Sequence, residues 1–545
     1  LLLVIFGGLA AASLPLAIGG IAILGSFTAL RLLTLVTPVS IYSLNITTIL
    51  GLGLAIDYGL FMVGRFREEL GRTDTVEQAV ARTVATAGRT VAVSGVTVAV
   101  ALASLMLFPM TFLRSMGYGG VATVLVDMAA GLTVLPALLA VLGPKVNALR
   151  VRPQRKAAAL ADETSGVWYR LARSVMRRPV IYVVVIVAGL ATLGTPFLHI
   201  TWGGTDARVL PTAAAPRVVT EALNHDFPGN ETNPIEVVVR FASPVAGQQG
   251  ALTAYVSRLE HVPGITGGQL SGAKGEVARV DLRYKPGPMT SQARAIAGQV
   301  RAVPPPEGAR VYVGGTTAQL VDELSSLGKT LPWMALVVFL ATFMLLFLAF
   351  GSVILPIKAM VMNVLSLSAT FGVVVWIFQD GHLSGLLHFT PTGTIDPTMP
   401  ILMLAIIFGL SMDYEVFLLS RVRERYDVTG DNTAAVASGL QRTGGVITSA
   451  ALLLVIVIGA FSASGITFIK LMGVGMIVAL IVDATIVRIM LVPATMRLLG
   501  RANWWAPQPL RRLYGRYGIS EGDGDDGGPD SAGPAAVPVS EPARA

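Results

Sequence analysis

The sequence contains no cysteine and few charged residues. Of its 545 residues, 14% are charged and 53% are hydrophobic, whereas soluble domains carry about 25% charged residues. The absence of cysteine excludes disulfides and thiolate chemistry. The shortage of charge and the mean hydropathy of +0.67 predict a membrane protein with many spans.

Motifs for several kinds of functional site are also missing. No G-x-x-x-x-G-K-[ST] sequence occurs, so nothing indicates ATP as an energy source. The five histidines lack metal-ligand spacing, and we expect neither a metal nor a cofactor. The formal charge is +8, but Lys and Arg gather at the ends of apolar segments, as membrane topology requires. We therefore expect no nucleic-acid partner and no enzymatic activity.

The apolar segments predict the membrane topology, because a spanning helix needs about 20 apolar residues. Connections 65–89, 143–178 and 421–442 are rich in Arg and Lys, whereas 379–396 has none. The positive-inside rule then places the basic connections and the C-terminus in the cytoplasm, below the plasma membrane. The predicted spans lie near 1–10 (partial), 13–36, 40–64, 88–109, 113–142, 179–198, 329–350, 353–378, 397–420, 445–464 and 467–498.

Residues 199–328 form the long polar segment, which this topology places outside the cell. The segment alternates between helical and strand patterns, and this order predicts a small α+β sandwich with helices on one sheet face. The predicted helices lie near 214–226, 249–260 and 290–302, and the predicted strands lie at 233–241, 276–284 and 309–315.

The chain contains an internal repeat, which is clearest in two motifs. GLGLAIDYGLFMVGRFREEL, starting at Gly51, matches IFGLSMDYEVFLLSRVRERY, starting at Ile407. Asp413 follows Asp57 by 356 residues, and both motif spans run from outside to inside. The halves are therefore expected to be parallel repeats. The same offset pairs Tyr58 with Tyr414, Arg65 with Arg421, Gly117 with Gly473, and Asp127 with Asp483.

The repeat also predicts how the chain is divided. Phe350-Gly351 ends a span that follows the polar segment, and Phe6-Gly7 is its counterpart. A first helix and a first outer domain, roughly 170 residues, are therefore expected upstream of a truncated start. The predicted divisions are a truncated first-repeat bundle (1–142), a basic cytoplasmic linker (143–178), a transmembrane helix (179–198), an outer α+β domain (199–328), a second-repeat bundle (329–498) and a cytoplasmic, mostly disordered tail (499–545).

The duplicated Asp-Tyr pairs are the strongest candidates for function. An Asp at the centre of a spanning helix costs about 2.5–3.5 kcal/mol. Asp57 and Asp413 carry this cost at matched positions, and two facing desolvated carboxylates cannot both ionise cheaply. We therefore predict a proton site in which Tyr58 and Tyr414 each hydrogen-bond to the Asp of the other repeat. The alternative is a buried polar pair that only fixes helix register.

Two further pairs of residues accompany these motifs. Gly53 and Gly409 precede the aspartates by one helical turn, and small residues allow close helix packing. We expect the two acid-bearing helices to pack on each other, with each Asp over the other's glycine. Asp127 and Asp483 are candidate accessory intramembrane acids, either for proton access or helix pairing, or in a snorkelling or interhelical hydrogen-bond role.

The two Asp-Tyr motifs and the FGSVILPIKA turn at 350–359 resemble the MMPL family of the resistance-nodulation-division (RND) superfamily. The resemblance covers nearly the whole chain. It implies a multi-span α-helical membrane protein with two parallel-repeat helix bundles. One porter-like extracytoplasmic α+β domain is present in this chain. It also implies proton-driven export of lipids or other hydrophobic molecules, with Asp57, Tyr58, Asp413 and Tyr414 as the proton relay.

Two other functions remain open. The same scaffold can serve as a lipid- or sterol-sensing receptor without transport. Two membrane acids can also activate a water in an intramembrane aspartyl protease, although such an enzyme does not need a duplicated outer domain. The expected partners are membrane lipids or a small hydrophobic substrate, together with protons. The identity of the cargo and the formation of homo-oligomers stay open.

Overall fold

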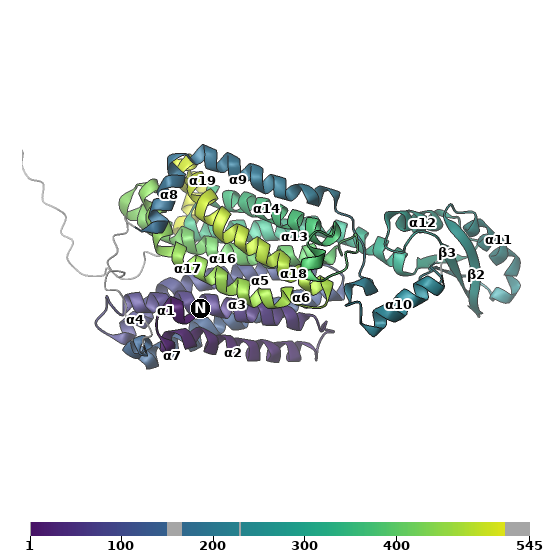
Figure 1. The fold of residues 1–545 in the computed structure, drawn as a ribbon, viewed down its shortest axis with the longest axis horizontal. Helices are drawn as coiled ribbons and strands as arrows, with labels where there is room; N and C mark the ends of the chain where they lie inside the picture. The colour runs from purple at the N-terminus through teal and green to yellow at the C-terminus, as the bar shows by residue number, and fades with distance from the viewer. Residues whose placement is uncertain (1, 150–165, 228–229, 518–545) are drawn as a thin grey trace, which may run out of the picture.

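The computed structural model describes residues 2–149, 166–227 and 230–517. Within these ranges, ten helices are long and apolar enough to cross a membrane, and they pack into one bundle (Figure 1). A small domain built around a β-sheet, here called the sheet domain, projects from one end of the bundle (Figure 1). The predicted fold class, a multi-span helical membrane protein with a porter-like domain, is confirmed.

The helices of the first repeat follow one another along the bundle. The short helix α1 covers Leu2–Phe6. The other elements are α2 (Leu9–Leu33), α3 (Ser43–Glu69), α4 (Val76–Thr83), η1 (Val84–Gly88), α5 (Arg89–Ala103), η2 (Ser104–Leu107), α6 (Thr111–Ala129), η3 (Ala130–Val134), α7 (Leu135–Leu142) and η4 (Gly143–Asn147).

The second repeat follows the same order. Helices α8 (Val167–Arg177) and α9 (Pro179–Gly194) connect the first repeat to the sheet domain. The second-repeat elements are α13 (Thr316–Phe350), α14 (Ile354–Val374), η9 (Val375–Gln379), α15 (Ser384–Leu387), α16 (Thr398–Thr429), α17 (Asn432–Ser462), α18 (Thr467–Ile481), η10 (Val482–Leu491), α19 (Val492–Leu499), η11 (Gly500–Trp504) and α20 (Gln508–Tyr517).

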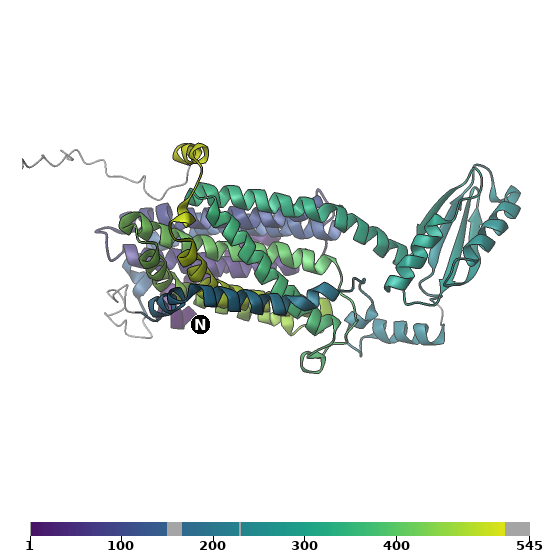
Figure 2. The same cartoon turned by 90° about the horizontal axis from the view of Figure 1, so that it is seen from above.

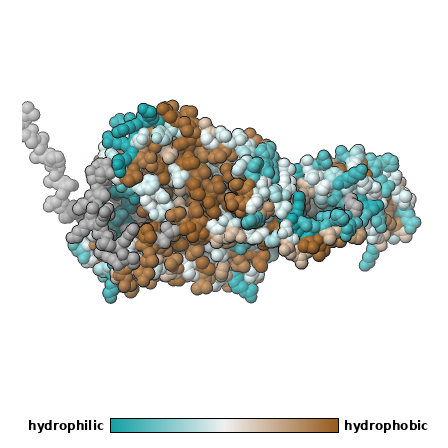
Figure 3. Space-filling view, viewed as in Figure 1, coloured by the Kyte–Doolittle hydropathy of each residue, from teal (hydrophilic) through white to brown (hydrophobic). Residues whose placement is uncertain are grey.

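The outer surface of the bundle is apolar along its length. Figure 3 shows a hydrophobic belt across the face of the bundle in view, with polar surface toward its ends and over much of the sheet domain. Large aliphatic side chains such as Val184 on α9 and Leu340 on α13 are more than half exposed. An apolar surface this extensive is not stable in water, so the belt is the surface that contacts lipid.

Equivalent contacts show the duplication in three dimensions. Arg67 donates a hydrogen bond to the carbonyl of Phe6 at 3.0 Å, and Arg423 donates one to the carbonyl of Phe350 at 3.4 Å. Phe6 and Phe350 are the last residues of α1 and α13. Each arginine therefore binds a free carbonyl at the end of a helix. Gly351 follows with a φ of 64°, which favours glycine because it has no Cβ.

A π-helical turn interrupts the last long helix of each repeat. Elements η3 and η10 lie directly before α7 and α19, whose first turns contain Pro136 and Pro493. Proline has no N–H to donate, so a regular helical bond is already missing there. Pro493 follows Pro136 by 357 residues, one more than the offset of the repeat. The longer π segment, ten residues in η10 against five in η3, accommodates this additional residue.

The sheet domain consists of four antiparallel strands in the order β2-β3-β1-β4. Side chains on one face of β1 and β3 pack against α11 and α12, which forms a separate hydrophobic core. Figure 2 shows the domain at the far end of the long helix α13. Its elements are α10 (Ala215–Asp226), β1 (Ile235–Arg240), α11 (Gln249–Glu260), β2 (Ile265–Lys274), β3 (Val277–Tyr284), α12 (Ser291–Ala302) and β4 (Arg310–Gly314).

Strand β2 was not predicted. It lies at the edge of the sheet, is mostly exposed and contains Gly267, Gly268 and Gly272. Its pairing with β3 shifts register twice, between Ile265 and Gly267 and between Leu270 and Gly272. These irregularities remove the alternation of apolar and polar residues that identifies a strand in a sequence.

Several predicted divisions run through continuous structure. The boundary at 328/329 falls inside α13, which joins the sheet domain to the bundle without a break. The basic linker includes the amphipathic helix α8, whose Trp168 packs on Gly444 of α17. Near the start of the tail, the Trp504 side chain donates to Asn432 at 3.2 Å. The rest of the linker (150–165) and of the tail (518–545) lies outside the described residues.

We expect Gly473→Val to destabilise the bundle. A Cβ at Gly473 would lie 2.5 Å from the backbone nitrogen of Ser462 and 2.9 Å from the carbonyl carbon of Phe461, so α17 and α18 would have to separate. Overpacking of this kind costs about 1–3 kcal/mol. The matched control is Gly459→Val on α17, where a Cβ meets nothing within 4 Å. Thermal unfolding in detergent should show a lower midpoint for Gly473→Val only, and equal midpoints would contradict the packing.

Candidate functional site

The helices that carry the Asp-Tyr motifs form the centre of the bundle. In the most apolar 18-residue stretch of α3, and likewise of α16, 89% is buried inside the protein. The corresponding share in α2 is 28%. Both helices are apolar on nearly every face, which is typical of a helix surrounded by others. Asp57 and Asp413 are 5% and 8% exposed, so both carboxyl groups lie inside the protein and away from lipid.

One hydrogen bond joins the two motifs across the repeats. The Tyr414 hydroxyl donates to Oδ2 of Asp57 at 2.5 Å. The reciprocal bond expected from the sequence, from Tyr58 to Asp413, is not formed. Instead the Tyr58 hydroxyl lies beside Gly95 of α5, where a Cβ would approach it to 3.4 Å. The two halves of the site are therefore unequal in this conformation.

Tyr58 nevertheless occupies the point where the buried acids converge. Its hydroxyl has no hydrogen-bond partner among the described side chains. The carboxyl groups of Asp413, Asp127 and Asp57 all lie within electrostatic reach of it. Tyr58 is thus within electrostatic reach of candidate acids from both repeats.

The predicted packing of Gly53 and Gly409 needs correction. A Cβ at Gly409 would lie 3.0 Å from Val98 of α5, and Gly53 faces Leu454 of α17. Each glycine therefore packs on a helix of the other repeat, but not on the other acid-bearing helix. The reason is that α5 packs along α16 and α17 packs along α3. The two acid-bearing helices meet through larger side chains instead.

Aromatic rings close the seam between α3 and α16 on the side of the basic connections. Phe61 and Phe417 each follow a motif Asp by four residues, and their ring centroids lie 3.4 Å apart at 41°. The rings and the Tyr414–Asp57 bond lie one helical turn apart. A layer of hydrocarbon therefore separates the acids from the basic end of the bundle.

The second repeat holds a buried ion pair that the sequence analysis missed. Nη2 of Arg488 lies 2.6 Å from Oδ2 of Asp483, and both side chains are almost fully buried. The Ser411 hydroxyl donates to Oδ1 of Asp483 at 2.9 Å. The Arg488 guanidinium also lies 5.3 Å from the centroid of the Tyr414 ring. This pair therefore connects directly to the Asp-Tyr centre.

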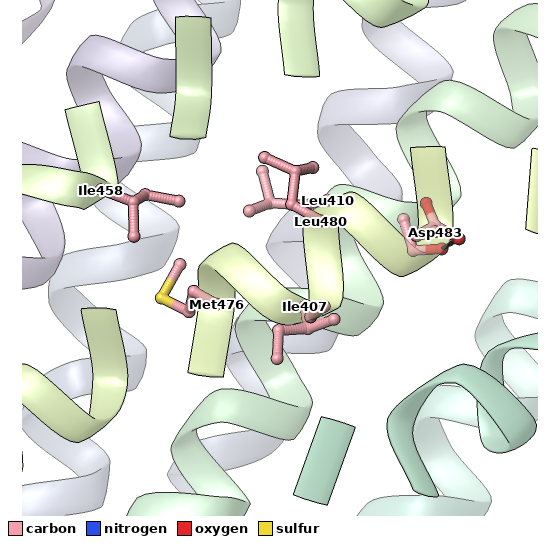
Figure 4. Close-up of a pocket in the computed structure, with 8 residues that line it drawn as sticks. Ile407, Leu410, Ile458, Met476, Leu480 and Asp483 are labelled. Atoms are coloured by element: carbon pink, nitrogen blue, oxygen red, sulfur yellow. Dashed lines mark hydrogen bonds between the residues drawn. The ribbon is translucent and has the colours of Figure 1, made fainter. Parts of the chain in front are cut away.

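A small cavity adjoins this ion pair. Figure 4 shows its lining, in which Asp483 lies at one end and apolar side chains including Ile407, Leu480 and Met476 extend away from it. Its volume of about 10 Å³ has room for one water at most. The Asp483–Arg488 pair is therefore stabilised mainly by protein groups.

Lys358 of α14 and Glu415 of α16 are also buried, and each acts electrostatically on the other. A signal for these residues and for Arg488 was present in the sequence. Each is an ionisable residue within an apolar span, and such residues are functional candidates by default. The repeat pattern does not point to these residues, because the corresponding positions of the first repeat carry no charged side chains.

A larger cavity lies where the bundle meets the sheet domain. Its volume is about 540 Å³, and we call it the outer cavity. Tyr42 packs edge-on against Phe112 and Phe468, with ring centroids 6.1 and 5.4 Å apart. Three carboxyl groups, two methionines and the side chains of Thr, Ser and Gln residues complete the lining. The aromatic and acidic lining residues are Tyr42, Phe112, Phe468, Asp322, Glu323 and Asp396.

Comparison with known proteins gives a consistent result over the whole chain. A family model described as the MMPL family matches residues 1–182 and 209–517. A putative membrane protein of Streptomyces coelicolor is 44% identical over 546 residues, which cover 100% of this chain and 73% of the relative.

Mycobacterial relatives match nearly as much of the chain. The trehalose monomycolate exporter MmpL3 of Mycobacterium tuberculosis is 37% identical over 552 residues, covering 95% of this chain and 58% of the relative. The mycolic acid-containing lipids exporter MmpL11 of Mycolicibacterium smegmatis is 34% identical over 522 residues, covering 94% of this chain and 54% of the relative. The chain thus spans little more than half the length of these two relatives.

We expect Tyr414→Phe and Tyr58→Phe to differ in stability, although the two residues are repeat mates. Tyr414→Phe removes the hydrogen bond to Asp57, which should cost about 1–3 kcal/mol. Tyr58→Phe removes a buried hydroxyl that forms no hydrogen bond, so it should not lower the stability. Unfolding in mixed micelles measures both values. Equal losses would show that the two hydroxyls have the same surroundings.

Proposed function

The chain belongs to the MMPL family, and on that premise we propose that it is a proton-driven transporter that exports lipids or other hydrophobic molecules. Asp57, Tyr58, Asp413 and Tyr414 form the proton relay in this proposal. The observation that carries it is the hydrogen bond from Tyr414 to Asp57, which joins the two repeats at the buried centre of the bundle.

The position of this bond suggests how protons drive the cycle. Asp57 on α3 and Tyr414 on α16 belong to different repeats, so a change of charge on Asp57 alters a contact between the halves. A proton that crosses a potential of 100 mV releases about 2.3 kcal/mol. That energy is comparable to the strength of one hydrogen bond to a charged group. Protonation of Asp57 would therefore weaken the contact and let the repeats shift.

The proposed cargo is an amphipathic lipid. The names of the mycobacterial relatives describe exporters of mycolate-containing lipids. The outer cavity supports a related cargo here because it combines aromatic rings with carboxyl groups. Rings can cover an acyl chain, and carboxyl groups can bind hydroxyls of a polar head.

The proposed orientation places the sheet domain outside the plasma membrane. Arg65, Arg421 and their neighbours lie at the opposite end of the bundle from the sheet domain. Arg65 pairs with Glu69 at 3.0 Å, and Arg421 pairs with Glu424 at 2.8 Å. Excess basic residues remain at this end and favour a cytoplasmic position. The C-terminus would then be cytoplasmic as well.

We expect Asp57→Asn and Asp413→Asn each to abolish export, because an amide cannot bind and release a proton. Export is measured as radiolabelled lipid that reaches the cell surface, and membrane insertion is checked by protein abundance. Asp74→Asn, an exposed acid between α3 and α4, is the matched control and should leave export unchanged. Normal export by both motif variants would contradict the proposal.

The same variants separate the alternatives. A lipid-sensing receptor on this scaffold would show no proton flux in reconstituted vesicles that contain a pH-sensitive dye. A transporter would show a flux that Asp57→Asn and Asp413→Asn remove. An intramembrane protease would release cleaved peptides from a membrane substrate, and the transporter would not.

We also expect Ser326→Trp to reduce export, because the indole would occupy the outer cavity that Ser326 lines. Ser325→Trp is a close control, since Ser325 is exposed and does not line the cavity. Lipid export by the two variants gives the comparison. If both retain full export, the outer cavity is not on the path of the cargo.

A further inference from the structure

The repeat-related acids Asp127 and Asp483 have very different surroundings. Asp483 accepts two hydrogen bonds from Arg488, at 2.8 and 2.6 Å, and one from Ser411 at 2.9 Å. Asp127 is 0% exposed, and neither of its carboxyl oxygens has a hydrogen-bond partner among the described residues. The same position in the fold therefore holds a paired acid in one repeat and a lone acid in the other.

The difference follows from substitutions at the repeat offset. Gly131 lies against the Tyr58 side chain as Arg488 lies over the Tyr414 ring, and the offset of 357 that relates Pro136 to Pro493 also relates Gly131 to Arg488. Ala55 stands at the position of Ser411. The first repeat has therefore lost both the cation and the hydroxyl that bind the second-repeat acid. Helix α2 does not replace them, because its single basic residue, Arg31, lies in its last turn near the sheet domain.

The groups that face Asp127 are few. Helix α6 packs against α2, α3, α5, η2, η3 and α16. Elements η2 and η3 contain no titratable residue, and Arg89 of α5 lies at the basic end of its helix. The titratable residues toward the centre of the neighbouring helices are Asp57 and Tyr58 on α3, and Asp413, Tyr414 and Glu415 on α16. Among these, the carboxyl group of Asp127 acts on Tyr58.

The balance of buried charge leads to the same assignment. The central parts of the spans bury five acids but only two bases, Lys358 and Arg488. Arg488 neutralises Asp483, and Lys358 lies near Glu415. No base remains for the other acids, and an isolated buried carboxylate takes up a proton instead of staying charged. The three unpaired acids are Asp57, Asp127 and Asp413.

We propose that Asp127 is a third proton-binding residue, which stores a proton beside Tyr58, whereas its repeat mate Asp483 stays an ionised member of a fixed ion pair. Gly131, one turn after Asp127 on the same helix, faces the Tyr58 side chain, and Tyr58 lies within electrostatic reach of Asp127 and of both motif acids. In this proposal the Tyr58 oxygen accepts the proton of Asp127 and passes its own hydroxyl proton to a motif acid. The proton path then runs through the first repeat. The proposed transfer, though not the protonation of Asp127 itself, rests on the function proposed above.

Infrared difference spectroscopy of the purified full chain in lipid nanodiscs tests this assignment. A protonated carboxyl group gives a carbonyl band that shifts in D2O, and an ionised one does not. Asp127→Asn, which keeps the shape of the side chain, should remove one such band near neutral pH. Asp483→Asn is the matched control and should remove none. An unchanged spectrum for Asp127→Asn, or a lost band for Asp483→Asn, would overturn the proposal.

Two exchanges between the repeats provide an independent test. Gly131→Arg gives Asp127 the partner that Asp483 has, because Gly131 faces Tyr58 as Arg488 faces Tyr414 and a Cβ there meets nothing closer than 3.7 Å. It should therefore remove the same band as Asp127→Asn. Arg488→Leu makes the second repeat resemble the first, so it should add a band from Asp483. Retention of the Asp127 band in a folded Gly131→Arg variant would count against the proposal. The spectra do not depend on export, so a failure here is distinguishable from a failure of the proposed transport.

Discussion

An isolated charge is costly inside an apolar protein, and this constraint governs the centre of the structure. Each buried acid needs a cation, a hydrogen-bond donor or a proton. The three solutions occur side by side: Asp483 has Arg488, Asp57 has the Tyr414 hydroxyl, and Asp127 has neither. Groups that differ in this way respond differently when a proton arrives, which is the property that a proton-coupled transporter requires.

Duplication places this chemistry between the two repeats. The backbones of α3 and α16 do not pack closely on each other. Helix α3 packs on α17, and α16 packs on α5, so each packs on a helix of the opposite repeat. The Tyr414–Asp57 bond and the Phe61–Phe417 contact therefore cross a boundary between repeats, not the core of one. At the basic end, Arg67 and Arg423 hold matching helix ends, which keeps each half rigid.

The two repeats differ in their buried charged residues. Gly59 stands where the second repeat has Glu415, and Gly131 stands where it has Arg488. The backbone elements remain equivalent, including the π turns before Pro136 and Pro493. Packing requirements preserve the fold of both halves, whereas a charged group can be lost from one half once the other supplies it. The site at the centre is consequently asymmetric.

The sequence by itself determined the spans, the parallel repeats and the positions of the paired acids, because hydropathy, charge and offset are one-dimensional properties. It did not reveal the edge strand β2, whose bulges break the alternation. The partners of Gly53 and Gly409, the single Tyr414–Asp57 bond and the lone Asp127 were decided by the tertiary structure. The physical reason is that the face a helix turns to each neighbour depends on the packing of all the helices together.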